Sequence, residues 1–106
     1  MSATQTPWGR SEHARVIAEG IVFHSTASHG GFKLSAGRLA EMPGALRRIS
    51  LESKLHGPGG WFEEDCEAAA VVFGFPQLFP PEQVQSARRM LAAVYPAAFS
   101  APRVPA

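Results

Sequence analysis

Apolar residues occur in short clusters separated by glycine and proline, and their spacing is strand-like in the first third of the chain. Val16-Ile17 and the run over 21–25 flank Glu19-Gly20, a pattern typical of a β-hairpin. A second turn over 27–31 leads to a third short strand at 32–34. This part of the sequence therefore predicts a three-stranded antiparallel meander.

The spacing becomes helix-like after Ser35, whose hydroxyl can accept a hydrogen bond from a free amide at the start of a helix over 36–42. One more helical turn can follow at 45–49, and the glycine-rich segment 56–60 predicts a loop. We expect a central helix over 61–73, because acidic residues crowd its start and a stretch rich in alanine and valine follows.

The last helix is the clearest element of the sequence, and Pro81 suits its first turn. Its single apolar stripe, with i, i+3, i+4, i+7 spacing, consists of Val84, Ala87, Met90, Leu91 and Val94. We thus predict an α+β fold in which the meander packs against about three helices. A chain of 106 residues needs one core. We expect a single domain over 7–96, with a flexible arm at 1–6 and a flexible tail at 97–106.

The charge balance argues against nucleic acid as the main partner. Ten basic and nine acidic residues give a net charge of +1, and only 18% of the residues are charged. Such a chain has no broad positive field to hold a phosphate backbone. A nucleic-acid-binding factor is therefore the third of three functions that we consider, and its basic residues would be Arg38, Arg47, Arg48 and Lys54. The largely neutral surface is compatible with a homodimer.

The cysteine content and the apolar runs favour the cytoplasm. Cys66 is the single cysteine, which excludes an internal disulfide and a zinc site built from cysteines. A reducing compartment fits this usage best. The first twenty residues lack the apolar run of a secretory signal, and no apolar run reaches the roughly 18 residues that a membrane span needs. We expect no membrane contact.

Three stretches together resemble a known sequence pattern. The chain has TPWG at 6–9, STASHGGFKLS at 25–35 and GWFEEDC at 60–66. These stretches resemble a family of small domains of unknown function, encoded by bacterial plasmids, phages and related mobile elements, with the pattern TPWG, STxSHGG and W[YF]EEDC. The similarity covers most of the chain from 6 to about 95. It implies a mobile-element setting, in which small proteins often inhibit host defence or act as accessory factors.

The turn Ser28-His29-Gly30-Gly31 is the first candidate site. Paired glycines can take positive φ, so their amides can converge into an anion-binding concavity beside the titratable His29. The simpler explanation is that the glycines serve the turn geometry alone and that His29 caps or packs.

The acidic run Glu63-Glu64-Asp65 is the second candidate site. It could supply oxygen ligands to a metal, or a general acid/base pair, with His29, His24 or His56 nearby in the fold. Neighbouring helical positions point about 100° apart, so at most two of the three carboxylates share a face. The simpler explanation is a favourable interaction with the helix dipole, or capping of loop amides.

Other catalytic arrangements find less support. A thiolate–imidazole pair of Cys66 and His29 is opposed by the neighbouring carboxylates. Ser25 and Ser28 lack the G-x-S-x-G context of a serine nucleophile. The sequence has no zinc-ligand spacing, phosphate-binding loop or dinucleotide motif, so we predict neither a metal nor a cofactor.

We therefore expect a noncatalytic protein that binds a macromolecule. The partner would be a protein, in concrete form a host defence complex that the chain inhibits in an anti-CRISPR-like or antirestriction-like way. The alternative is a small enzyme or metal-binding domain that uses His29 with the acidic run. The candidate binding residues are Ser28, His29, Gly30, Gly31, Trp61, Glu64 and Asp65. In either case, we predict that 28–31 and 61–65 lie against each other, with a carboxylate bonded to the turn.

Overall fold

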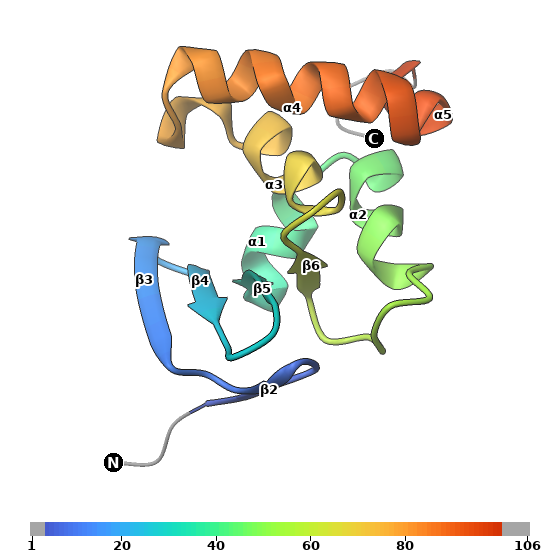
Figure 1. Ribbon diagram of the computed structural model, residues 1–106. Coiled ribbons are helices and arrows are strands. Elements are labelled where there is room, and N and C mark those ends of the chain that lie inside the picture. Colours follow the sequence, from blue (N-terminus) through green and yellow to red (C-terminus); the bar gives the residue numbers. More distant parts are fainter. Residues whose placement is uncertain (1–3, 101–106) are drawn as a thin grey trace.

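The computed structural model describes residues 4–100 and places helices mainly on one side of an antiparallel sheet (Figure 1). Its elements are β1 (Gln5–Thr6), β2 (Gly9–Arg10), β3 (His13–Ala18), β4 (Ile21–Ser25), β5 (Gly30–Leu34), α1 (Ala36–Glu41), α2 (Gly44–Leu51), β6 (Trp61–Glu63), α3 (Ala68–Gly74), the 3-10 helix η1 (Pro76–Leu78), α4 (Pro81–Val94) and α5 (Pro96–Ser100). The fold is α+β, as the sequence predicts.

The main sheet has the strand order β3-β4-β5-β6, and every neighbouring pair is antiparallel. The predicted meander is confirmed in β3, β4 and β5. Gly20 has a φ of +82° in the turn between β3 and β4, a conformation that glycine adopts without strain. Strand β6 lies beside β5 and adds a fourth strand to the meander. The strands β1 and β2 form a separate two-stranded hairpin.

The predicted central helix over 61–73 is wrong in its first half. Trp61–Glu63 is strand β6, residues 64–67 form a turn, and α3 begins only at Ala68. Two glycines explain the difference, because Gly59 and Gly60, with φ of +131° and +83°, turn the chain onto the edge of β5. The backbone of Gly60 accepts a hydrogen bond from the Leu34 amide at 2.9 Å. Pairing with β5 therefore outweighs the helical pattern of the acidic run.

The core lies between the sheet and the helices. Phe62 is fully buried opposite Phe32, and these two rings face the helical layer. The core residues are Ile21, Phe32, Leu34, Met42, Leu46, Ile49, Phe62, Ala69, Ala70, Val71, Val72, Phe75, Ala87 and Leu91. The stripe predicted for α4 is confirmed at its centre, whereas Val94 is 45% exposed and lies where α4 gives way to α5.

The chain ends carry more secondary structure than the sequence predicts. Helix α5 occupies 96–100, starting at the last residue of the predicted domain and continuing into the predicted tail, and β1 occupies 5–6, within the predicted arm. The rest of the predicted arm and tail, at 1–3 and 101–106, lies outside the described residues. None of the helices in the described part of the chain is both long and apolar enough to cross a membrane.

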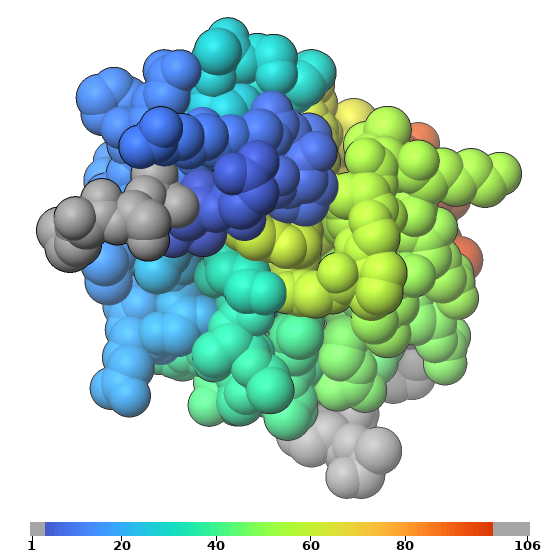
Figure 2. Space-filling model, turned by 90° about the horizontal axis from the view of Figure 1, so that it is seen from below, coloured from blue at the N-terminus to red at the C-terminus, as the bar shows by residue number. Residues whose placement is uncertain are grey.

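The N-terminal hairpin fits against the sheet because Gly31 has no side chain. In the hairpin, Thr6 Oγ1 donates to the Gly9 carbonyl at 2.6 Å and accepts from the Trp8 amide at 3.1 Å. The Trp8 ring then reaches Gly31, where a Cβ would lie 2.4 Å from Trp8 Cη2 and 2.5 Å from the Phe62 carbonyl. Figure 2 shows this hairpin in blue, filling the space beside the yellow-green loop that precedes β6.

We predict that Gly31→Ala destabilises the protein by about 2–3 kcal/mol, because the new methyl group meets a ring and a backbone carbonyl in a packed site. Gly57→Ala is the matched control, since a Cβ at Gly57 meets nothing within 4 Å. The measurement is urea unfolding of both variants and of the unmodified protein. Equal midpoints for the two variants would contradict the packing of Trp8 on Gly31.

Candidate functional site

The two segments singled out in the sequence lie against each other. Gly31 is the register partner of Glu63 across the β5–β6 pair. One residue further along, the Glu64 amide donates to the Gly30 carbonyl at 3.0 Å, and Glu64 Oε2 accepts from the Gly30 amide at 3.0 Å. The predicted juxtaposition, with a carboxylate bonded to the turn, is therefore confirmed.

The positive φ that an anion-binding glycine pair requires is not found at Gly30 and Gly31. Gly30 and Gly31 are extended residues of β5 without positive φ. The turn is instead held by Thr26, whose Oγ1 donates to the His29 carbonyl at 2.6 Å and accepts from the amides of Ser28 and His29. Gly30 is required by space, because a Cβ there would lie 2.8 Å from the His24 carbonyl. Its amide already binds the Glu64 carboxylate, so it offers no free donor to an anion.

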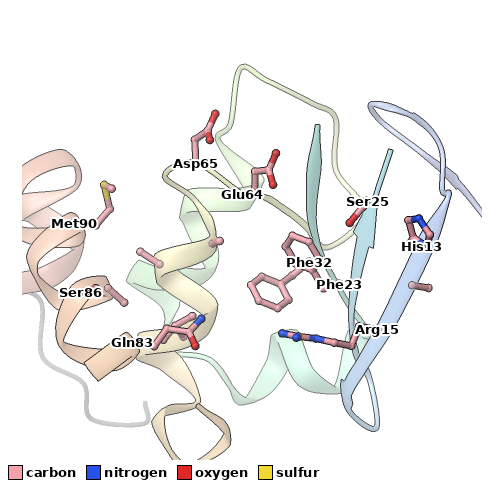
Figure 3. Close-up of a pocket in the computed structure, with 15 residues that line it drawn as sticks. His13, Arg15, Phe23, Ser25, Phe32, Glu64, Asp65, Gln83, Ser86 and Met90 are labelled. Atoms are coloured by element: carbon pink, nitrogen blue, oxygen red, sulfur yellow. The ribbon is translucent and has the colours of Figure 1, made fainter. Parts of the chain in front are cut away.

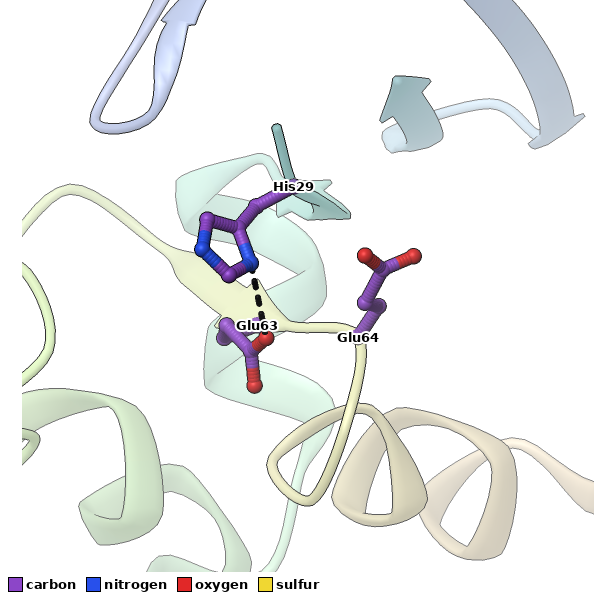
Figure 4. Close-up of side chains that lie close together, drawn as sticks. All are labelled: His29, Glu63 and Glu64. Carbon is purple, nitrogen blue, oxygen red and sulfur yellow. Dashed lines mark ion pairs between the residues drawn. The ribbon is translucent and has the colours of Figure 1, made fainter. Parts of the chain in front are cut away.

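The three acidic residues have different environments. Glu63 is buried, and its Oε1 accepts from the Asp65 amide at 2.9 Å, while its Oε2 lies 3.8 Å from His29 Nδ1 (Figure 4). Glu64 and Asp65 are exposed. Burial raises the pKa of Glu63, and the neighbouring Asp65 charge adds to this effect, against the opposing backbone hydrogen bond. Thus one buried carboxylate and one exposed carboxylate flank the His29 ring.

A buried cluster around Glu67 was missed by sequence reasoning. Glu67 Oε1 accepts from the Glu63 amide at 2.9 Å and lies 2.6 Å from His56 Nε2, and its Oε2 accepts from the Ser53 hydroxyl. His56 Nδ1 faces the Gly57 carbonyl at 2.8 Å, so this nitrogen carries a hydrogen. The 2.6 Å contact between Nε2 and Glu67 Oε1 is therefore a hydrogen bond between the imidazole and the carboxyl group. Glu67 joins the loop before β6 to the turn before α3.

The TPWG and GWFEEDC stretches meet through the rings of Trp8 and Trp61. Trp8 contacts the rings of Trp61 and His56 edge-on, with centroids 5.7 and 5.9 Å apart. His24 lies 5.7 Å from Trp61, and its Nδ1 is 2.8 Å from Ser11 Oγ. Burial lowers the pKa of His24, and the charge of Lys33 lowers it further. These contacts join the N-terminal hairpin to strands β4 and β6 and to the loop before β6.

A first cavity of about 690 Å³ opens between the sheet and helices α3 and α4 (Figure 3). Phe23 and Phe32 form its floor on the strands, and Met90 lies on the opposite helix. Glu64 and Asp65 line its upper end, and Arg15 reaches in from β3. Two of the three residues of the acidic run, Glu64 and Asp65, thus lie at the rim of this cavity.

A second cavity, of about 600 Å³, lies between α2, α5 and the 52–55 segment. Leu55 and Val94 line it, with Arg48 and Lys54 among its charged residues. Tyr95 lines the same cavity; burial raises its pKa, and the nearby carboxylates of Glu67 and Glu63 raise it further. Cys66 itself is a half-buried free thiol.

Two of the four basic residues considered for nucleic-acid binding form hydrogen bonds or ion pairs within the protein. Arg38 donates to the Glu19 carbonyl at 2.8 Å and pairs with Glu41 at 3.1 Å. Arg47 donates to the Leu39 carbonyl at 3.2 Å. This leaves Arg48 and Lys54, both exposed at the second cavity, as the basic residues of the set directed outward.

The chain belongs to the family described as a domain of unknown function, DUF7007, whose model matches residues 1–103. No curated protein and no solved structure matches the chain significantly. The family assignment agrees with the resemblance at the level of a domain of unknown function. The mobile-element origin stays a prediction.

We predict that Glu67→Ala lowers the free energy of unfolding by about 3–5 kcal/mol, because it leaves a buried imidazole, a hydroxyl and an amide without their acceptor. Glu67→Gln should cost less, since its single carbonyl oxygen replaces one of two acceptor atoms. Glu52→Ala, at an exposed site, is the control. Chemical denaturation measures all three. A Glu67→Ala variant as stable as the control would refute the structural role of this cluster.

We predict that His24 makes stability fall as the pH drops below about 6.5. Its folded pKa is lowered, so the unfolded chain binds more protons in this range, and unfolding becomes easier toward acid. The slope from one such group is at most about 1.4 kcal/mol per pH unit. His24→Asn keeps a partner for Ser11 and should flatten the pH dependence, whereas exposed His13→Asn should not. Identical slopes between pH 5 and 7 for both variants would disprove the assignment.

Proposed function

We propose that this protein acts without catalysis, by binding a protein partner through the surface around the second cavity. Among the described residues, four large apolar side chains are prominently exposed. Leu55 (62% exposed) and Val94 (45%) line that cavity, and Leu51 (55%) projects from the adjacent end of α2. We call these three residues the α2–α5 surface. This grouping is the observation that carries the proposal, because clustered exposed apolar residues mark interaction sites.

The chemistry of the α2–α5 surface favours an amphipathic helix with acidic flanks. A cavity lined by apolar side chains can receive the apolar face of a helix. Arg48 and Lys54 lie at its border and would attract carboxylates of the partner, although Glu52 reduces the local positive charge. An apolar centre bordered by a few charges resembles the anatomy of protein interfaces more than that of nucleic-acid sites.

The hydrogen bonds of Glu63, Glu64 and Glu67 support a binding protein over a hydrolytic enzyme. Glu64 holds the Gly30 amide, and Glu67 holds the loop before β6. Glu63 accepts the Asp65 amide. Each of these carboxylates therefore has a structural task, and the motif that attracts attention in the sequence helps to fix the fold.

The partner that we propose is a protein of a host defence complex, and the protein would be a mobile-element factor that inhibits it in an anti-CRISPR-like or antirestriction-like manner. This finer proposal rests on the resemblance of the TPWG, STxSHGG and W[YF]EEDC stretches to small proteins of plasmids and phages. The size of the chain and its low net charge are compatible with it.

The test compares Leu55→Asp/Val94→Asp with Val16→Asp. Val16 is equally apolar and 68% exposed, but it lies on β3, away from the α2–α5 surface. We expect affinity capture from bacterial lysate to recover a stoichiometric partner with the unmodified protein. The double variant should recover less than a tenth of this amount of partner, and Val16→Asp should recover nearly all of it. Circular dichroism checks that both variants fold.

Immunity assays complete this test. Expression of the unmodified protein should raise phage plating or plasmid transformation in a defence-competent host, and the double variant should not. Absence of a stoichiometric partner, together with unchanged immunity, would contradict the proposed function. Equal loss of the partner in Val16→Asp would contradict the location of the surface.

A further inference from the structure

The side chains of His29, Glu63 and Glu64 converge at one end of the β5–β6 pair, where β5 begins and β6 ends. One potential ligand atom from each, a ring nitrogen and two carboxylate oxygens, lies within 4.8 Å of the other two. Figure 4 shows the imidazole directed from the turn toward Glu63, with Glu64 beside it. We propose that these three residues form a binding site for a divalent transition-metal ion, with Zn²⁺ as the best match. This site is independent of the α2–α5 surface.

The buried Glu63 carboxylate gives an electrostatic reason for a cation here. Its side chain is only 6% exposed, and among the described residues it forms one ion pair, with His29, which is 52% exposed and charged only when protonated. The 3.8 Å between Glu63 Oε2 and His29 Nδ1 is too long for a hydrogen bond, so this oxygen points at the imidazole without binding it. Hydrogen bonds from the backbone of Asp65 and Cys66 offset part of the cost of burying this carboxylate, and a metal ion between the two groups would offset more of it.

The other charged groups near Glu63 also favour the binding of a cation. Residues 63–67 contain four carboxylates. The ion pairs of the described residues bring two imidazoles to this segment, those of His29 and His56. The His56 imidazole is already hydrogen-bonded to Glu67. One exposed imidazole therefore faces the remaining carboxylates, and it carries a charge only when protonated.

The backbone around the three ligands is already fixed. Strand pairing sets the position of Glu63 opposite Gly31, and the Thr26 hydroxyl holds the backbone of His29. Glu64 binds the Gly30 amide through Oε2, which leaves Oε1 for a metal. Ligand atoms around Zn²⁺ lie about 3.3 Å apart, given bonds of about 2.0–2.1 Å. In the structure these atoms lie within 4.8 Å of one another, and small rotations of the exposed His29 and Glu64 side chains would bring them to the spacing that Zn²⁺ requires.

The donor set selects the class of ion. One imidazole nitrogen with two carboxylate oxygens suits Zn²⁺ or Mn²⁺, whereas Mg²⁺ and Ca²⁺ prefer oxygen alone. Three protein ligands leave at least one coordination position open, for water or for an atom of a bound molecule. Asp65, an original member of the acidic candidates, lies outside this set and contributes its amide to Glu63.

The test is calorimetric titration of the untagged, metal-free protein with ZnCl₂. We expect one Zn²⁺ per chain, with affinity at least tenfold weaker in His29→Ala, Glu63→Gln and Glu64→Gln. His13→Ala and Glu52→Gln are matched controls, an exposed histidine and an exposed carboxylate outside the set, and should bind as the unmodified protein does. His29 is half-exposed, so its variant remains informative even if Glu63→Gln unfolds.

A second readout locates the ion. Substoichiometric MnCl₂ should broaden the amide NMR signals of 29–31 and 63–65 first, and His29→Ala should abolish this selectivity. MgCl₂ should bind at least tenfold more weakly than ZnCl₂. Failure to bind Zn²⁺, equal affinities of His29→Ala and His13→Ala, or broadening centred on other residues would each overturn the proposal.

Discussion

The pairing of β6 with β5 is the constraint on which the rest of the structure depends. It places Phe62 on the core face opposite Phe32, and Glu63 on the other face opposite Gly31. Because successive strand residues point to opposite faces, one short strand supplies both a core ring and the buried carboxylate of the candidate metal site. The missing Cβ of Gly31 then admits Trp8, which ties the N-terminal hairpin to the same face.

Two carboxylates, Glu63 at the end of β6 and Glu67 in the turn after it, lie at the two proposed binding surfaces. Glu67 accepts a hydrogen bond from Ser53 and contacts His56 within the fold, and it lines the second cavity below the α2–α5 surface. Glu63 is left facing a half-exposed imidazole at the sheet edge. The turn at 64–67 therefore connects the proposed metal site to the proposed protein-binding surface.

Sequence reasoning succeeded where local periodicity determines the structure. The β3–β4 hairpin, the meander, the Ser35 cap, with its Oγ accepting from the Arg38 amide, and helix α4 follow from short-range patterns. The predicted helix over 61–73 was wrong at 61–67, because hydrogen bonds to β5, distant in the sequence, outweigh the helical pattern of the acidic run. The juxtaposition of 28–31 and 61–65 was predicted correctly. The His56–Glu67 pair was missed, since its single signal in the sequence is a glutamate beside an alanine-rich run.

The role of Gly31 and Glu63 as neighbours across the sheet can be measured directly by NMR. Opposed residues of a non-hydrogen-bonded antiparallel pair have Cα atoms about 4.5 Å apart, so their α-protons lie close together. The hydrogen bond from the Glu64 amide to the Gly30 carbonyl puts Gly31 and Glu63 in this class. We predict a strong nuclear Overhauser cross-peak between the α-protons of Gly31 and Glu63. Strong sequential amide–amide cross-peaks through 61–65 without this contact would indicate a helix, and would contradict the account.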